Sequence, residues 1–272
     1  MPELPEIETT KRGVSPRLLN QFISKTLVRQ EKLRVPVNHN IDDLCKGKQI
    51  IDVTRRAKYL IIHLTEGYLF IHLGMSGHIR FVSPETPAGK HDHIDLVLEN
   101  NMILRYNDPR RFGLWLYIKD SPSEHPLLSH LGPEPLTDEF NSDYLFKRAQ
   151  NKTQPIKSFI MDNKIVVGVG NIYAAESLFL AGINPLSPAG SITLEKIISL
   201  TNHIKDTLAL AIKAGGTTLR DFYAADGKPG YFSNELKIYG RQNNPCYLCE
   251  TIILSTTIGG RNSAFCPNCQ PN

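Results

Sequence analysis

The sequence predicts an α+β protein with a β-rich N-terminal half, a helical region and a short cysteine-bearing hairpin. Between about residues 22 and 119, short apolar or alternating runs are separated by turn residues, which is typical of strands. From about residue 138 onward, apolar residues recur at the three- and four-residue spacing of helices. Four of the five cysteines form two Cys-x-x-Cys pairs near the C-terminus. The 272 residues are enough for two domains and a small module.

The N-terminal half is expected to begin with a helix over residues 3–19. Six strands are then predicted: Ile51–Val53, Tyr59–Leu64, Tyr68–His72, His78–Val82, Ile94–Leu98 and Met102–Tyr106. No helical pattern separates these strands. The arrangement therefore favours a sandwich or a barrel.

A breaker cluster, Leu131–Pro135, marks the expected linker to the helical region. Helices are predicted near residues 138–150, 155–162, 171–181 and 193–213, and Asn171 is expected to cap the helix Ile172–Leu180. Residues 215–235 are rich in Gly, Thr, Asp and Pro, and we expect them to form a long functional loop.

The cysteine pairs predict one structural zinc site. Its expected ligands are Cys246, Cys249, Cys266 and Cys269. Two residues within each pair allow one turn to present both thiolates to a tetrahedral ion. Four thiolates leave no open coordination position, so the zinc is not expected to act in catalysis. The segment between the pairs should form a hairpin turning at Gly259-Gly260, beside Arg261. Cys45 stands apart and should be a core residue.

The N-terminus carries residues suited to covalent chemistry. Removal of Met1 would give Pro2 a free secondary amine, and α-amino groups have pKa values of about 7.7–8.0. Such an amine could attack a sugar C1′ and form an iminium. Glu3 and Glu6 would share one helix face, where a carboxyl could act as general acid or base. From the residues alone, the favoured interpretation is that these acidic side chains simply complement the helix dipole.

Charge and hydropathy indicate the cellular setting. The net charge is +4, and an acidic stretch over residues 120–143 gives way to a basic one over 144–164. No apolar run is long enough to span a membrane, and the acidic start does not resemble a targeting peptide. We therefore expect a cytoplasmic protein.

Several motifs together resemble the bacterial formamidopyrimidine-DNA glycosylases, a family of DNA glycosylase/AP lyases, over essentially the whole chain. The matching segments are Pro2–Glu6, Arg55–Leu60, His72–Gly77, Lys90–His93, Asp108–Gly113, Gly168–Tyr173 and the four-cysteine finger. Each segment is weakly specific alone. Their order and spacing are highly specific.

The resemblance implies an N-terminal catalytic β-sandwich (residues 1–132), a helical DNA-binding domain with a helix–two-turn–helix motif (133–235) and a zinc finger (236–272). It also implies base-excision repair of damaged double-stranded DNA. The enzyme would remove oxidised purines, chiefly 8-oxoguanine and formamidopyrimidines, and cut the strand by β- and δ-elimination. We expect a monomer in association with the nucleoid.

The resemblance also assigns roles at matching positions. Pro2 would be the nucleophile, Glu3 the proton donor and Glu6 a support for the sugar. Lys58 would act in β-elimination, and Arg261 would act in δ-elimination and phosphate positioning.

Six further positions would contact DNA. Met75, Arg110 and Phe112 match the side chains that fill the gap left by a flipped base, which enzymes acting on bases must create. His91, Lys152 and Asn171 match other DNA-contacting positions, and the 215–235 loop resembles the segment that closes over the damaged base.

Two alternatives stay open at this point. One is an endonuclease VIII-type glycosylase for oxidised pyrimidines, although Leu4 fits the purine-directed branch. The other is a non-catalytic zinc-ribbon protein that binds nucleic acid. That alternative explains the finger and the basic residues but not the Pro-Glu start.

Overall fold

The computed structural model describes residues 2–217 and 232–272. The chain divides into two compact units. Unit 1 comprises Met1–Ser129 and Ala214–Tyr231, and unit 2 comprises His130–Lys213 and Phe232–Asn272. No helix among the described residues is both long and apolar enough to cross a membrane.

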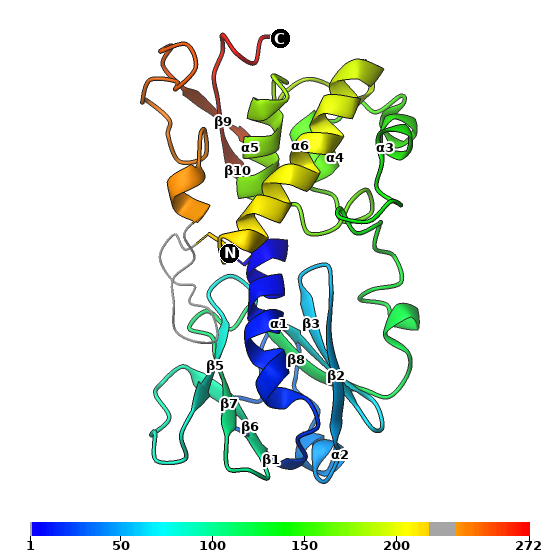
Figure 1. Cartoon of the computed structure of the whole chain (residues 1–272), viewed down its shortest axis with the longest axis vertical. Coiled ribbons are helices and arrows are strands. Elements are labelled where there is room, and N and C mark those ends of the chain that lie inside the picture. Colours follow the sequence, from blue (N-terminus) through cyan, green and yellow to red (C-terminus); the bar gives the residue numbers. More distant parts are fainter. Residues whose placement is uncertain (1, 218–231) are drawn as a thin grey trace. The chain divides into compact units, whose positions relative to one another are not determined.

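Unit 1 is an antiparallel β-sandwich flanked by a helix. One sheet has the strand order β1-β6-β7-β5 and the other β2-β3-β4-β8 (Figure 1). The strands are β1 (Ile23–Val28), β2 (Ile50–Arg56), β3 (Tyr59–Leu64), β4 (Tyr68–His72), β5 (His78–Val82), β6 (Asp92–Leu98), β7 (Ile103–Asn107) and β8 (Leu114–Ile118). The six predicted strands are all present. β1 and β8 were not among the predicted strands, and they complete the two sheets.

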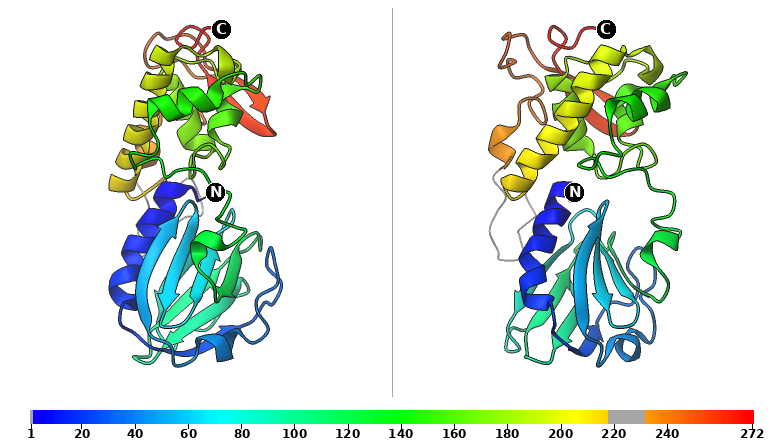
Figure 2. Two further views of the ribbon diagram at one scale, coloured as in Figure 1. Left: turned by 90° about the vertical axis from the view of Figure 1, so that its right-hand side faces the viewer. Right: turned by 45° about the vertical axis from the view of Figure 1, so that its right-hand side comes forward.

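The helix α1 (Leu4–Leu18) lies alongside β2 and β3 (Figures 1 and 2). It confirms the helix predicted over residues 3–19 and continues through Gly13 and Pro16. A short helix, α2 (Ile41–Cys45), and a 3₁₀ turn, η1 (Pro122–Glu124), complete the regular elements among the described residues of unit 1.

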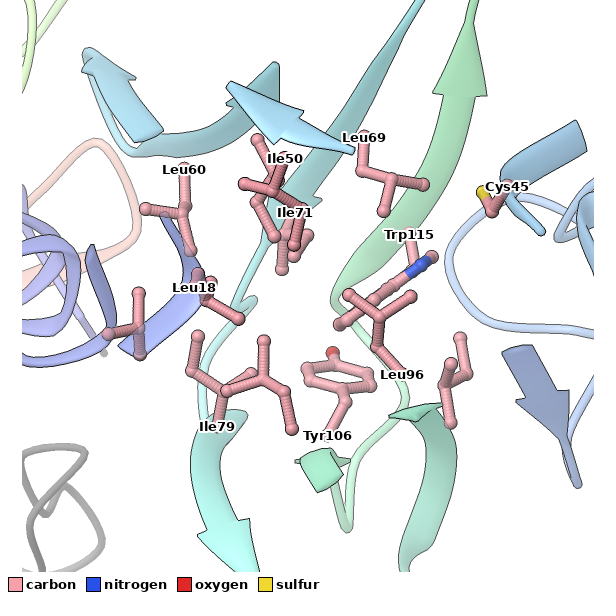
Figure 3. Packing of buried hydrophobic residues seen from close by; sticks show 14 of the residues in the cluster. Leu18, Cys45, Ile50, Leu60, Leu69, Ile71, Ile79, Leu96, Tyr106 and Trp115 are labelled. Atoms are coloured by element: carbon pink, nitrogen blue, oxygen red, sulfur yellow. The ribbon is translucent and has the colours of Figure 1, made fainter. Parts of the chain in front are cut away.

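The core of unit 1 lies between the two sheets. Figure 3 shows Ile50, Ile71 and Trp115 of one sheet facing side chains of the other. Ile79, Leu96 and Tyr106 supply the opposing layer, and Leu18 of α1 joins the same cluster. Alternate residues of antiparallel strands point to one face, so a two-residue period in the sequence fills this layer. Cys45 is fully buried, as predicted for a core residue.

Unit 2 is helical and ends in the cysteine-bearing hairpin. Its helices are α3 (Ser142–Ala149), α4 (Ile156–Ile160), α5 (Asn171–Leu180) and α6 (Leu194–Lys213), with 3₁₀ turns η2 (Ala189–Ser191) and η3 (Phe232–Glu235). All four predicted helices are present. α5 is apolar around most of its circumference because it lies between α6 and the hairpin (Figure 1).

The hairpin consists of β9 (Leu254–Ile258) and β10 (Arg261–Phe265). Gly259 and Gly260 form its turn with φ of +55° and +72°. A two-residue turn with two positive φ angles is the geometry that glycine permits most readily, which explains this pair at the predicted position.

Candidate active site and nucleic-acid interface

The first turn of α1 gathers three of the predicted site residues. Pro2, Glu3 and Glu6 are all buried. Glu3 precedes the helix and forms a capping box with Glu6, in which the Glu3 backbone N–H donates to Glu6 Oε2 at 2.7 Å. A carboxylate at a helix N-terminus is stabilised by the helix dipole and by the amides that the cap satisfies. Pro2 is therefore placed beside two ordered carboxylates.

Glu6 also binds a segment far away in the sequence. Its Oε1 accepts the backbone N–H of Thr217 at 2.7 Å. Gly216 approaches so closely, with φ of +86°, that a Cβ there would lie 3.1 Å from Glu6 Oε1. Gly216 and Thr217, at the start of the segment predicted as a loop over 215–235, thus lie against the Glu6 carboxylate. Residues 218–231 of that segment lie outside the described part of the chain, as does Met1.

Lys58 lies in the two-residue turn between β2 and β3 and is half-buried. Its neighbour Ala57 has a positive φ of 53°. Arg55 braces this turn, since its Nη1 donates to the Ala57 carbonyl at 2.9 Å and its Nε donates to Glu8 Oε2 on α1 at 3.0 Å. The turn lies at the same end of unit 1 as the start of α1 (Figure 1).

The charge of Glu8 helps to hold that turn in place. Burial raises the pKa of Glu8, but hydrogen bonds from Lys11 and Arg55 outweigh it and leave the pKa below its ordinary value. Glu8 is therefore ionised near neutral pH and binds both cations. The structure thus links Lys58 to the helix that carries Glu3 and Glu6.

The three predicted gap-filling residues lie on two adjacent loops of unit 1. The side chains of Met75 and Phe112 are 40% and 48% exposed, which places them at loop tips rather than in the core. The Arg110 guanidinium lies 4.9 Å from the centre of the Phe112 ring. A Cβ on Gly74 would come within 2.5 Å of the Phe112 carbonyl carbon, so the loops are in direct contact. His91 lies in a third loop, directly before β6.

Unit 2 contains the other predicted DNA-contacting residues and corrects one expectation. Gly170, not Asn171, is the N-cap of α5, and Asn171 is the first helical residue. The Asn171 side chain instead donates to the Asn262 carbonyl on β10 at 3.2 Å. The reason is tertiary, because β10 packs beside α5 and supplies an acceptor there.

Arg261 and Lys152 are both exposed. Arg261 begins β10 at the glycine turn, next to the residue that Asn171 contacts. Lys157 of α4 donates to the same Asn262 carbonyl at 3.3 Å and to Ser263 Oγ at 2.7 Å. The base of the Arg261 turn is thus hydrogen-bonded to two helices. The Lys152 backbone is held by bonds to Ala149 and Gly190.

The four cysteines converge as a zinc site requires. The sulfur atoms of Cys246, Cys249, Cys266 and Cys269 all lie within 4.8 Å of one another. Tetrahedral zinc with Zn–S bonds of about 2.3 Å would hold sulfur atoms about 3.8 Å apart. The Cys246–Cys269 and Cys249–Cys266 separations of 3.9 and 3.5 Å fit that geometry. The residues therefore fit one structural zinc ion. Cys246 and Cys266 also pack with Ala175 and Phe179 of α5.

Sequence reasoning missed several residues that organise these sites. Thr217 is separated from Glu6 by 211 positions, so no local pattern pairs them. The Arg55–Glu8 pair likewise depends on the packing of α1 against β2. Asp108 accepts a hydrogen bond from the Gly113 N–H in its own loop. This role could have been predicted locally, because an aspartate before a proline is typical of turns in which the side chain binds the backbone.

Comparison with known proteins then identifies the family. Three protein-family models match: the formamidopyrimidine-DNA glycosylase N-terminal domain over residues 1–115, the formamidopyrimidine-DNA glycosylase H2TH domain over 131–223, and a zinc finger found in FPG and IleRS over 243–272. The chain belongs to the formamidopyrimidine-DNA glycosylase family.

Relatives in this family are similar to the chain over their whole length. Formamidopyrimidine-DNA glycosylase from Legionella pneumophila (strain Lens) is 60% identical, covering 100% of this chain and 99% of the relative. The enzyme of that name from Haemophilus influenzae (strain PittEE) is 56% identical, covering 99% of both chains.

Solved structures of the family share the fold. The MutM (FPG) protein from Thermus thermophilus has a TM-score of 0.88 and 36% identity, with 99% and 98% of the two chains covered. The Lactococcus lactis Fpg in complex with abasic-site DNA has a TM-score of 0.92 and 32% identity, with full coverage of both.

Proposed function

We propose that the chain is a base-excision repair glycosylase that removes oxidised purines from double-stranded DNA and then cleaves the strand as an AP lyase. Family membership over the full length supports this function, and relatives of known structure are complexes with abasic and formamidopyrimidine-containing DNA. The family match also favours this function over an oxidised-pyrimidine glycosylase or a non-catalytic zinc-ribbon protein.

The observation that carries the proposed mechanism is the position of Pro2 beside two ordered carboxylates, Glu3 and Glu6. After loss of Met1, the Pro2 amine attacks the sugar C1′ and forms an N–C1′ bond while the glycosidic bond breaks. Glu3 donates a proton that allows the sugar ring to open, and an iminium results. Glu6 holds Glu3 and the start of the 215–235 loop in place.

Strand cleavage then proceeds from the iminium. Loss of a proton from C2′ expels the 3′-phosphate, and a second elimination expels the 5′-phosphate. We assign Lys58 to the first elimination and Arg261 to the second. An arginine rarely gives up its proton, so Arg261 is assigned chiefly to positioning and neutralising phosphate.

The remaining site residues are assigned to DNA. Met75, Arg110 and Phe112 fill the gap left by the flipped base, and His91, Lys152 and Asn171 contact the backbone. Within this assignment residues 1–132 carry Pro2, Glu3 and Lys58, and residues 133–235 bind the duplex. Residues 236–272 form a finger that presents Arg261 and that zinc stabilises when bound. We infer a monomer that works at the nucleoid, where its substrate is found.

Reductive trapping tests the mechanism. Borohydride is added to the protein with duplex DNA that contains one 8-oxoguanine, and mass spectrometry locates the adduct. We expect a covalent complex at Pro2 in protein that has lost Met1, and no adduct at Pro2 in protein that retains Met1, where the Pro2 nitrogen is an amide. Pro2→Gly should lose most base excision while keeping its affinity for the duplex. A mature protein that binds the duplex but gives no adduct would refute the imine mechanism. The excision rate from a second duplex that contains an oxidised pyrimidine shows which of the two substrate classes the protein prefers.

A further inference from the structure

Asp108 is a buried carboxylate that joins three loops of unit 1. It directly follows β7, and its side chain is completely inaccessible to solvent. None of the catalytic steps described above uses it. No cation of the described residues lies within ion-pairing distance of its carboxylate. A buried carboxyl group without a counter-ion must be stabilised by directed hydrogen bonds.

Four donors supply those bonds. Oδ1 accepts the Ser76 hydroxyl at 3.0 Å and, more weakly, the Arg110 backbone N–H at 3.3 Å. Oδ2 accepts the Gly113 N–H at 2.8 Å and the Tyr106 hydroxyl at 3.0 Å. Ser76 follows Met75, while Arg110 and Gly113 are on either side of Phe112. One carboxylate therefore binds the base of both loops that carry the exposed Met75 and Phe112 side chains.

The Asp108 backbone binds the third loop. Its N–H donates to the His91 carbonyl at 3.0 Å, and its carbonyl accepts the His93 Nε2–H at 2.8 Å. Asp108 therefore contacts three loops of the sandwich. Together these loops carry its proposed DNA-contacting residues other than Lys58.

Close packing fixes the two gap-filling loops around this carboxylate. A Cβ on Gly113 would overlap the Tyr106 hydroxyl, and a Cβ on Gly74 would lie 2.5 Å from the Gly113 nitrogen. Burial, reinforced by the Asp108 charge, raises the pKa of Tyr106, so its hydroxyl stays protonated and remains a donor. The loop bases are rigid although their tips are exposed.

We propose that Asp108 is a positioning residue that holds Met75, Arg110 and Phe112 in the arrangement in which they fill the gap left by the flipped base. Asp108 touches neither DNA nor the reacting atoms and acts through the loops that it binds. This inference rests on the proposed function.

Asp108→Asn provides a sharp test because it preserves shape and changes hydrogen bonding. An amide nitrogen cannot accept a hydrogen bond. Either the Ser76 and Arg110 donors or the Gly113 and Tyr106 donors would therefore face another donor. Loss of hydrogen bonds to a charged group is expected to lower the excision rate of 8-oxoguanine from duplex DNA by about 10- to 100-fold.

Two comparisons separate positioning from a general structural role. The first is cleavage at a preformed abasic site, where no base must be unstacked, and we expect its rate to fall by less than about threefold. The second is a double-mutant cycle, in which Asp108→Asn is introduced into Phe112→Ala. Residues that act through one another are not additive. We therefore expect Asp108→Asn to change excision little in that background.

The matched control is Asp95→Asn. Asp95 is a buried aspartate of β6 that pairs with Arg105 and Arg29, away from the gap-filling loops. Asp95→Asn should lower the melting temperature without changing the ratio of the 8-oxoguanine excision rate to the rate of cleavage at the abasic site. If Asp108→Asn does not fold, Ser76→Ala decides, because it removes one donor from the same carboxylate and should change the rate ratio in the same direction.

Equal losses on both substrates, additivity with Phe112→Ala, or an equal change of rate ratio in Asp95→Asn would each overturn the proposal. A wild-type protein that neither excises the lesion nor forms the borohydride adduct would instead refute the proposed function. An active wild type with an additive cycle refutes only the role of Asp108.

Discussion

The Glu6 carboxylate accepts the Thr217 backbone N–H at 2.7 Å through one oxygen and the Glu3 N–H at 2.7 Å through the other. The first turn of α1 is thereby bonded to the start of the 215–235 loop. One buried side chain thus binds both the proposed proton donor and Thr217.

Glu6→Ala should release Thr217. Alanine has no side-chain acceptor, so the hydrogen bonds from both N–H groups to residue 6 are lost. Bonds to a charged group contribute about 1.5–3 kcal/mol, which corresponds to a 10- to 100-fold faster exchange of the Thr217 amide. Hydrogen exchange with mass spectrometry measures this, and the Ile7 amide, bonded to the Glu3 carbonyl, is the internal control. Unchanged exchange at Thr217 would contradict the proposed link.

Met75→Ala and Phe112→Ala should cost little stability but slow excision. Both side chains are substantially exposed, so unfolding free energies should change by only about 0.5 kcal/mol. Phe70→Ala, at a fully buried position, is the control and should cost about 3–5 kcal/mol. Thermal melts and excision rates on duplex DNA decide the matter. A loss of stability comparable to that of Phe70→Ala would place both residues in the core.

Cys246→Ser should lose zinc and weaken DNA binding. Its sulfur belongs to the four-thiolate cluster and to the small core that packs on Ala175 and Phe179 of α5. Loss of the ion should disorder the hairpin that carries Arg261, while the β-sandwich of unit 1 keeps its own core. Atomic absorption and duplex affinity are the measurements. Cys45→Ala, a buried cysteine outside the cluster, should keep one zinc per chain, and active wild type without zinc would refute a structural metal.

His72 should make stability fall in mild acid. Burial, with the Arg34 and Lys58 charges, lowers the pKa of His72 to about 4, below its ordinary value of 6.5. Its Nδ1 accepts the Gly74 N–H at 3.0 Å, which requires a neutral ring. The unfolded state therefore binds the proton first, and stability is lost as the pH falls from about 6.5 towards 4.

The full loss, reached below pH 4, is on the order of 3 kcal/mol, because one pKa unit corresponds to 1.36 kcal/mol. Urea unfolding at pH 7 and pH 5 measures the part of the loss that falls between these two pH values. His72→Asn keeps an acceptor near the Nδ1 position but does not titrate, so its stability should change less between the two pH values. Identical pH dependence in wild type and His72→Asn would show that His72 does not contribute.

Lys152→Ala should weaken DNA binding evenly across sequences. The side chain is exposed on a turn whose backbone is fixed by Ala149 and Gly190. If it neutralises one phosphate, the slope of log affinity against log salt should decrease in magnitude by about one. Lys119, with a 75% exposed side chain in unit 1, provides the control. A slope equal to that of wild type would remove Lys152 from the interface.

The sequence by itself determined the elements whose signals are local. β3, β4 and β5 match the predicted bounds because short apolar or alternating runs bounded by turn residues specify a strand locally. The spacing of Cys246 and Cys249, with that of the second pair, specified the zinc site through the geometry of one turn and one ion. Met75 and Phe112 are exposed, and each lies close to residues typical of turns, Gly74 and Asp108-Pro109, which is a local signal of the same kind.

Only the tertiary structure decided which distant groups pair. Asparagine is a residue type that often caps helices. The Asn171 side chain nevertheless donates to the Asn262 carbonyl, because β10 lies against α5. Glu6 reaches Thr217, and Asp108 binds Ser76, across sequence separations that no periodic pattern encodes. A buried carboxylate must find donors wherever packing brings them. Its partners are therefore fixed by the assembled sheets and helices rather than by its sequence neighbours.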